Sequence, residues 1–486
     1  MVAPEDQELY DLIIKRDWDG ALALIDPSRY EEKQELLDKV NSGDVSPLIL
    51  ILKNYDDMAR DLCLKLIDIG GEDLVNISDD DGSALHCACG FDIGDMEVIR
   101  RLVEVGGIKL ISLPEKYDGQ TALYRAHYPE DARVLVEAGG KELVLKKDNC
   151  GRTVLHTILR FLDHDVMDTF RLLLEVGGEE LVMVTDRDHR TALHYAFDSM
   201  TENEINRQIV HDMLEVGGRK LVLLADRDGR TALHDACICW ESYPESVSHL
   251  LAIGGEKLAM TTDRNGKTAL HDACEWRKEL NAEVYRQLLE VGREKLLLMS
   301  DRYGSTALHL ASNWMWKHNP EIFRQMLDLG KEKLLFMADN HGKTALHKLC
   351  SHTDELHPEA VELVLELGGE DILLKTDFCG KTALHYVCHT SNSTSNETSD
   401  LNSVSSNTSN QTSERQHLLN KIETVYHMLD MGRMELLLVR DLGYRTAMQI
   451  ELRQENPSEE IIDRFIEIAG NDFLLDKLSE NDLNNE

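Results

Sequence analysis

A nine-residue motif, DxxGxTALH, recurs along the chain and constrains its fold more than any other feature. Close copies begin at residues 148, 186, 226, 263, 301, 339 and 377, and looser copies at 78, 116 and 441; an eleventh, VSPLI at 45–49, lacks the preceding turn residues. The spacing is 37 to 40 residues, typically 38, apart from one interval of 32 and one of 64. A glycine that ends each unit, from Gly70 to Gly470, keeps nearly the same spacing. The two markers agree on eleven units and predict a repeat array.

Each unit has the composition of a turn followed by two short helices, as residues 226–262 illustrate. Gly229 is expected to supply the backbone angle of the turn. Thr231 is expected to cap the first helix, with His234 reaching back to it as Glu does in a capping box. The segment ESVSHLLAI predicts a second helix that ends at Gly254–Gly255 in a left-handed cap. Because such short helices are marginal alone, stacking must stabilise them.

The same pair of side chains defines the motif in the later units. It is expected to cap first helices at Thr231 and His234, Thr268 and His271, Thr306 and His309, Thr344 and His347, and Thr382 and His385.

This pattern resembles the ankyrin repeat, a turn plus two antiparallel helices with a T-P-L-H-x-A signature over about 33 residues. The segments TALHDAC and LLxxGG carry the resemblance, which covers roughly residues 41–476. The period is longer here, with extra residues between the helices and after the glycine pair, and Ala usually replaces the family's Pro. The resemblance implies an all-α ankyrin-type solenoid of stacked helix-turn-helix units with short turn or hairpin connections.

Three segments depart from the repeat. Residues 1–40 lack the motif but contain two short amphipathic stretches, and we expect them to form an N-terminal helical cap for the array at 41–476. The 64-residue interval contains a Ser/Thr/Asn-rich stretch, and residues 390–415 are expected to be a disordered insertion within one repeat. Residues 477–486 are expected to form a C-terminal tail.

The charge and composition exclude several classes of protein. With 89 acidic and 52 basic residues the formal charge is −37, which repels a phosphate backbone, so we expect no nucleic-acid partner. No apolar run is long enough to span a bilayer, and the start MVAPEDQELYDLII lacks the pattern of a secretion signal. Ten irregularly placed cysteines fit reduced thiols. We expect a monomeric, intracellular protein, cytoplasmic with the nucleus left open, that is not secreted.

Several side chains could suggest chemistry. The His-Asp dipeptides that begin at His234 and His271 resemble those of metal-dependent phosphohydrolases, but six other histidines share the register without the Asp, which favours the capping role. Five cysteines share one helix position in different units, which indicates a packing site and not a metal site. The acids beside Gly in SDDDG and DRDG lack the residue order of an EF-hand loop, which favours solvated turn acids. With no P-loop, nucleophile elbow or dinucleotide motif, the sequence predicts no enzyme, no cofactor and no metal.

Two sets of residues are candidates for binding a partner. The first is an aromatic group just after the first helices: Trp240, Tyr243, Trp276, Trp314 and Trp316. These rings are either hot-spot anchors for a partner or packing over the lengthened loops between helices. The second is a strip of turn-tip arginines: Arg187, Arg227, Arg264 and Arg302. Pairing with Asp of neighbouring turns is the simplest interpretation of this strip.

We therefore predict a non-enzymatic scaffold or adaptor. The resemblance implies that it binds another protein on the concave face of the solenoid, and the negative charge favours a basic segment of that partner. Two alternatives stay open: a regulatory adaptor that recruits machinery through a phosphorylatable insertion at 390–415, and a passive structural spacer.

Overall fold

The computed structural model has two compact units, residues 1–253 (unit 1) and 254–486 (unit 2), and each is described by itself. The structure describes residues 7–25, 46–56, 58–90, 95–126, 128–159, 166–198, 204–238, 244–275, 282–312, 314–351, 356–389, 407–454 and 457–470.

Unit 1 begins with two short helices, α1 (Gln7–Ile14) and α2 (Trp18–Leu24). Its short first helices are α4 (Pro47–Lys53), α6 (Ala84–Ala88), the 3-10 helix η2 (Ala122–Arg125), α9 (Val154–Ile158), α11 (Ala192–Ala196) and α13 (Ala232–Ile238). The longer second helices are α5 (Arg60–Val75), α7 (Met96–Ile111), α8 (Pro129–Val144), α10 (Val166–Val182), α12 (Glu204–Val222) and α14 (Pro244–Ala259), within which unit 1 ends.

Unit 2 repeats the same alternation. Its first helices are α15 (Ala269–Glu275), α17 (Ala307–Ala311), α20 (Ala345–Ser351), α22 (Ala383–His389) and α24 (Ala447–Glu451). Its second helices are α16 (Ala282–Leu297), α19 (Pro320–Leu335), α21 (Pro358–Leu373), α23 (Asn407–Leu438) and α25 (Glu459–Ala469). A further short helix, α18 (Met315–His318), lies between α17 and α19.

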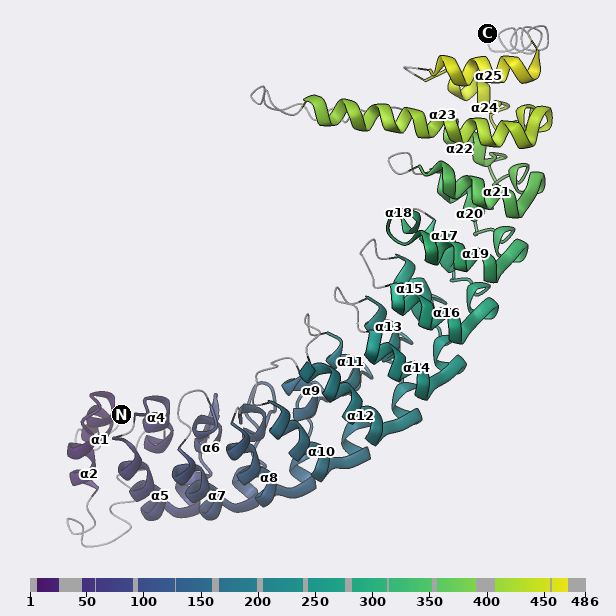
Figure 1. Cartoon of the computed structure of the whole chain (residues 1–486). Helices are drawn as coiled ribbons and strands as arrows, with labels where there is room; N and C mark the ends of the chain where they lie inside the picture. Colours follow the sequence, from purple (N-terminus) through teal and green to yellow (C-terminus); the bar gives the residue numbers. More distant parts are fainter. Residues whose placement is uncertain are drawn as a thin grey trace. The chain divides into compact units, whose positions relative to one another are not determined.

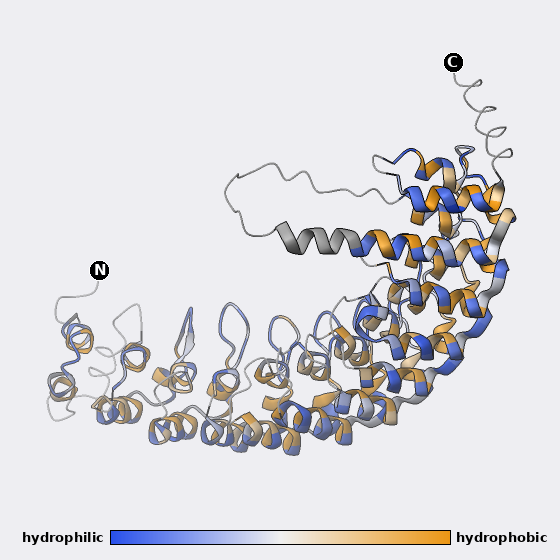
Figure 2. Cartoon of the chain, turned by 45° about the horizontal axis from the view of Figure 1, so that its top comes forward, coloured by the Kyte–Doolittle hydropathy of each residue, from blue (hydrophilic) through white to orange (hydrophobic). Residues whose placement is uncertain are grey.

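In each unit the first helices form one layer and the second helices another (Figure 1). Many of the helices have a hydrophobic side and a hydrophilic side (Figure 2). In the repeat that begins at Thr231, Leu233, Val247 and Leu250 are fully buried. Each such side chain contributes about 1.5–3 kcal/mol when it is removed from water. The predicted all-α stack of helix pairs is therefore confirmed.

Strands are short connections in this fold. β1 (Ser78–Asp79) and β2 (Gly82–Ser83) pair antiparallel, with Ser78 opposite Ser83. Three other turns are closed by isolated antiparallel bridges at Thr191, Thr231 and Thr306. The residue that caps each of these first helices thus also closes the turn before it.

The regular part of most of the second helices stops at the glycine pair, at a residue with positive φ, as predicted, but the sequence did not predict the helical turn that follows. Nine of the described second helices continue through a kink for about one further turn, as α14 does at Gly255. The kinked residues have φ between 48° and 62° and ψ between −146° and −162°. The added turn buries a leucine, Leu258 in α14. A Cβ at the preceding Gly254 would lie 2.4 Å from the Cβ of Leu258, so the first glycine of the pair leaves space for this leucine. The second, Gly255, adopts the positive φ of the kink.

Part of the predicted insertion is helical. Residues 390–406 lie outside the described residues, but α23 begins at Asn407 and thus includes 407–415. Val425, Met428 and Leu429 are buried and stabilise the middle of α23. Because no Pro or Gly lies between Asn407 and Tyr426, the helix can continue from this packed segment to Asn407. The predicted tail at 477–486 also lies outside the described residues.

Candidate functional site

The threonine and histidine of the motif form a reciprocal cap at the start of the first helix. In the repeat of Thr231, its backbone N–H donates to Nδ1 of His234 over 3.0 Å, and the Thr231 hydroxyl lies 2.9 Å from the same nitrogen. Seven other repeats have the same geometry, with the backbone donor at 3.1–3.2 Å and the hydroxyl at 2.8–2.9 Å: those of His86, His156, His194, His271, His309, His347 and His385.

The other ring nitrogen joins seven of these histidines to the following repeat. Nε2 of His309 lies 3.0 Å from the carbonyl oxygen of Lys343, the residue before the next Thr. Six further links of 3.0–3.3 Å connect His86 to Gln120, His156 to Arg190, His194 to Arg230, His271 to Ser305, His347 to Lys381 and His385 to Arg445. Because Nδ1 accepts from a backbone N–H, the proton of the neutral ring is on Nε2, which donates to the carbonyl. The sequence alone does not predict this second contact.

Burial sets the ionisation of these rings. It lowers the pKa of His86, His156 and His309 to about 4, while the hydrogen bond to the next repeat opposes the shift. Burial also lowers the pKa of His194, His271, His347 and His385. The histidines are therefore neutral at pH 7.

In most of the turns, an aspartate side chain accepts hydrogen bonds from backbone N–H groups of the same turn. Oδ1 of Asp226 accepts from the backbone N–H groups of Asp228, over 2.9 Å, and Arg230, over 2.8 Å. The turns are also linked to one another, since the N–H of Arg227 donates to the carbonyl of Asp188 over 2.7 Å. The equivalent aspartates at 148, 186, 301, 339, 377 and 441 are buried. In SDDDG and DRDG, the two segments interpreted as solvated turn acids, Asp80, Asp81 and Asp228 are exposed, whereas the first acids, Asp79 and Asp226, are half-buried.

Repeats with this cap and turn match a known family. A family model described as ankyrin repeats in three copies matches residues 239–336. The chain contains ankyrin repeats. The ankyrin repeat domain of Bcl-3, a member of the IkappaB protein family, is a similar solved structure. The match has a TM-score of 0.39 and 22% sequence identity, and it covers 57% of this chain and 99% of the Bcl-3 chain. No curated protein matches the sequence. The assignment rests on the family model and the repeat geometry, which extends beyond the matched residues to His86 and His385.

Ankyrin repeats are protein–protein interaction domains and are typically not enzymes. Their recognition surfaces are therefore the features to examine. Among the described residues, no group of three or more His, Cys, Asp or Glu side chains could hold a metal ion. In the same part of the chain, every helix is too short or too polar to cross a membrane.

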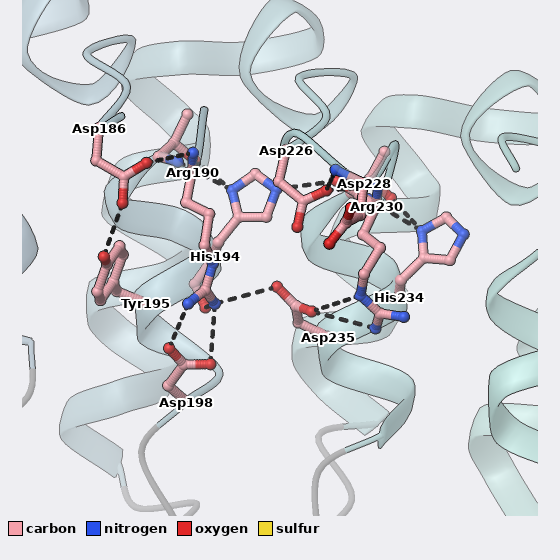
Figure 3. Close-up of polar contacts among 12 residues, drawn as sticks. Asp186, Arg190, His194, Tyr195, Asp198, Asp226, Asp228, Arg230, His234 and Asp235 are labelled. Atoms are coloured by element: carbon pink, nitrogen blue, oxygen red, sulfur yellow. Dashed lines mark hydrogen bonds and ion pairs between the residues drawn. The ribbon is translucent and has the colours of Figure 1, made fainter. Parts of the chain in front are cut away.

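In unit 1, charged side chains of neighbouring repeats form a network at the first helices (Figure 3). Arg190 makes two parallel bonds to Asp198, at 2.8 and 2.9 Å, and lies 3.4 Å from Asp235 of the next ankyrin repeat. Its guanidinium carbon is 4.7 Å from the ring centre of Tyr195. Arg230 binds the other oxygen of Asp235 over 3.2 Å. The acid of this His-Asp dipeptide thus pairs with arginines, and burial raises its pKa.

In unit 2, large apolar side chains stand at the tips of the turns. We call these four residues the tip strip: Tyr303, Phe378, Leu442 and Tyr444, which are 55%, 72%, 72% and 75% exposed. Successive turns are bonded through their backbones, with the N–H of Phe378 donating to His341 and that of Leu442 to Cys379. Phe378 thus lies one turn before Leu442 and Tyr444, whereas Tyr303 lies two turns before Phe378. These residues were not predicted as a binding surface, although they stand directly after turn aspartates or beside turn glycines, a position that the sequence shows.

The aromatic candidates are only partly described. Trp240, Tyr243 and Trp276 lie outside the described residues. Trp314 is 3% exposed, and its indole N–H donates to the carbonyl of Cys274 over 2.8 Å, which favours packing over binding at this position. Trp316 is half-buried, with its ring edge-on to Phe323 and below the guanidinium of Arg324.

All four arginines of the predicted turn strip lie in turns: Arg187, Arg227, Arg264 and Arg302. Arg227 is 3.4 Å from Asp188 of the previous turn, which is the predicted kind of pair. Arg302 instead donates to the amide oxygen of Asn265 over 2.9 Å and stacks on Tyr303. The strip is therefore not a uniform row of Asp–Arg pairs, because the residue opposite the arginine varies from turn to turn.

The cysteines at the shared helix position are buried: Cys89, Cys237, Cys274, Cys350 and Cys388. Burial raises the pKa of the Cys89, Cys274, Cys350 and Cys388 thiols, so they are protonated at pH 7 and behave as small apolar side chains.

Proposed function

We propose that this protein is a non-enzymatic scaffold or adaptor whose ankyrin repeats bind a segment of another protein through the tip strip of unit 2. The exposure of Tyr303, Phe378, Leu442 and Tyr444 at turn tips carries this proposal. Tyrosine is among the side chains that most often dominate the energy of protein interfaces, and large exposed apolar groups at neighbouring positions mark such interfaces.

Backbone hydrogen bonds between neighbouring turns fix the positions of the turn tips in the unbound protein. The backbone bonds between turns span 2.9 Å from Phe378 to His341 and 2.8 Å from Leu442 to Cys379. A Cβ on Gly342 would lie 2.8 Å from the ring of Phe378, so this ring rests against the turn before it. Binding to a preformed row loses less conformational entropy than binding to free loops, which favours affinity.

The charge of the chain suggests the character of the partner. A formal charge of −37 attracts a segment with net positive charge over long range, and apolar anchors on that segment would then contact the tip strip. Salt should slow association, because added ions screen this attraction.

Replacing the tip strip is expected to release the partner while leaving the fold intact. We expect the variant Tyr303→Ser, Phe378→Ser, Leu442→Ser and Tyr444→Ser to lose more than about tenfold in affinity for a protein captured from native cell extract. Affinity capture followed by titration of the captured protein measures this loss. The stability should change little, since the four side chains are exposed.

A matched control separates this effect from a general loss of surface apolarity. Ile108→Ser with Val216→Ser removes exposed apolar groups from unit 1 and should retain the captured protein. Equal capture by the tip-strip variant and by the unaltered chain would refute the proposal.

A further inference from the structure

The residue directly before the capping threonine is a cation in seven repeats, and in five of them it forms an ion pair inside the protein. These pairs join Arg152 to Asp148, Arg190 to Asp198, Arg230 to Asp235, Lys267 to Glu275 and Arg445 to Asp441. The other two cations, Lys343 and Lys381, belong to consecutive repeats of unit 2. Neither of them has an ion pair with any residue that the structure describes.

The acids that pair with the other cations are missing from these two repeats. Lys267 pairs with Glu275, which stands seven residues after the capping threonine, and in unit 1 Asp198 pairs from the same position. In the repeats of the two unpaired lysines, this position holds Ser351 and His389. The position four residues after the threonine, which supplies an acid in α13, holds a lysine and a tyrosine. The two repeats therefore keep the cation of an ion pair and lack its carboxylate.

Both lysines lie against the ring of Tyr386. Nζ of Lys343 is 4.5 Å from the ring centre, and Nζ of Lys381 is 5.5 Å from it. The sum of these distances, 10 Å, is the upper limit of the separation of the two ammonium groups. All three side chains are half-buried, so the two charges are partly removed from water and interact more strongly with an anion than fully solvated lysines do.

The two acids whose charges act on Lys343 are bound by other groups. Asp339 pairs with Lys348 over 2.8 Å and accepts from backbone N–H groups of its own turn. Asp377 accepts from the Tyr386 hydroxyl over 2.6 Å and likewise from its own turn. Burial and the neighbouring charge of Lys348 lower the pKa of Lys343 in spite of both acids. The local charge is therefore positive and incompletely compensated.

We propose that Lys343 and Lys381 bind acidic side chains of a partner protein, whose carboxylates take the place that Glu275 and Asp198 fill in their own repeats. Those internal pairs show that a carboxylate is the group that a cation at this position of the repeat binds. A formal charge of −37 does not attract an acidic partner over long range, so the binding energy must come from contact with the two lysines. The site contains no tip-strip residue and does not depend on the function proposed for that strip.

The binding test uses the full chain and fluorescence anisotropy of two labelled peptides that differ only in charge. Side chains at alternate positions of an extended peptide are about 7 Å apart, which is within the limit set by the two lysines. One peptide is therefore Gly-Glu-Gly-Glu-Gly and the other is Gly-Gln-Gly-Gln-Gly. We expect only the first to bind, and Lys343→Gln with Lys381→Gln to lower its affinity at least about fivefold. Because glutamine holds this position in the repeat of Thr121, the variant should fold.

Restoring the missing acids tests the proposal from inside the chain. Ser351→Glu with His389→Glu puts a carboxylate at the position of Glu275 in each of the two repeats. This variant keeps both lysines but should lose the acidic peptide, because its own carboxylates occupy them. Nitrogen NMR of the Lys343 ammonium group should show that its pKa rises, since an opposite charge favours the charged form.

A matched control removes the same charge elsewhere in unit 2. Lys295→Gln with Lys333→Gln should change the affinity for the acidic peptide less than about twofold, because these lysines already pair with Glu256 and Glu294. The proposal is wrong if the two peptides bind equally or if loss of the two site lysines leaves the affinity unchanged. It is also wrong if inorganic phosphate displaces the acidic peptide at a concentration at which acetate does not, since the site would then select phosphate.

Discussion

Lowering the pH from 7 to about 4.5 is expected to unfold the repeats. The seven histidines that link one repeat to the next are buried, and their pKa values lie below the ordinary 6.5, near 4 for His86, His156 and His309. The unfolded chain therefore takes up protons at higher pH than the folded chain does. The stability that comes from the neutral rings is complete above pH 6.5 and is lost as the pH falls towards 4.

The size of this effect follows from the difference in pKa. A folded-state pKa near 4 against 6.5 in the unfolded chain corresponds to about 3 kcal/mol for each of His86, His156 and His309. Together these three account for about 10 kcal/mol, which is comparable to the total stability of about 5–15 kcal/mol that is typical of folded domains. Urea denaturation followed by circular dichroism at pH 7, 6, 5.5 and 5 should show the midpoint falling steeply with pH.

The chain itself offers a control for this prediction. In the last repeat Gln449 takes the place of histidine, and its side-chain oxygen accepts from the N–H of Thr446 over 3.0 Å. His309→Gln with His347→Gln should keep the cap, lose the link to the next repeat, and reduce the pH dependence by about 1.4 kcal/mol per pH unit for each histidine removed. An unchanged pH dependence in this variant would show that other groups cause acid unfolding.

Replacing Arg293 and Lys331, the two residues at the nine kinks that are not glycine, by glycine is expected to stabilise unit 2. The conformation of Arg293 and Lys331 costs about 1–3 kcal/mol each in an L-residue. Glycine adds about 0.5–1 kcal/mol of unfolded-state entropy, so the net gain is about 0–2.5 kcal/mol for each site, and its midpoint for Arg293→Gly with Lys331→Gly is about 2.5 kcal/mol. Urea denaturation at pH 7 measures the increase in the free energy of unfolding.

The reverse substitution is the matched control. Gly178→Lys and Gly218→Lys introduce the same strain into two consecutive repeats of unit 1, where φ is 57° and 52°, and should destabilise by a similar amount. If the glycine variant of unit 2 is no more stable than the unaltered chain, the strain assigned to these positions is wrong.

The repeat fold was predictable because local signals recur in phase. Thr231 and His234 stand three residues apart in a pattern that a capping box requires, and Leu233, Val247 and Leu250 fall on buried faces. The helical turn after the glycine pair was not predictable in the same way, because a glycine such as Gly255 is also typical of a helix that ends.

The second contact of the histidines depends on the stacking distance between repeats. A sequence motif describes one repeat, whereas the link from His309 to Lys343 joins residues in two of them. The exposure of Phe378 and Tyr444 likewise depends on how the turns are arranged and not on their composition. The sequence could not decide whether Trp314 is buried, because the carbonyl that its indole N–H contacts, that of Cys274, belongs to the previous repeat.

The structural role of the histidines is tested most directly by nitrogen NMR of the imidazole rings. Each linking histidine should be a single neutral tautomer with its proton on Nε2 at pH 6.5, and His86, His156 and His309 should stay neutral below pH 6.5 for as long as the repeats remain folded. Rings that exchange between tautomers and titrate near 6.5 would contradict a structural link between repeats.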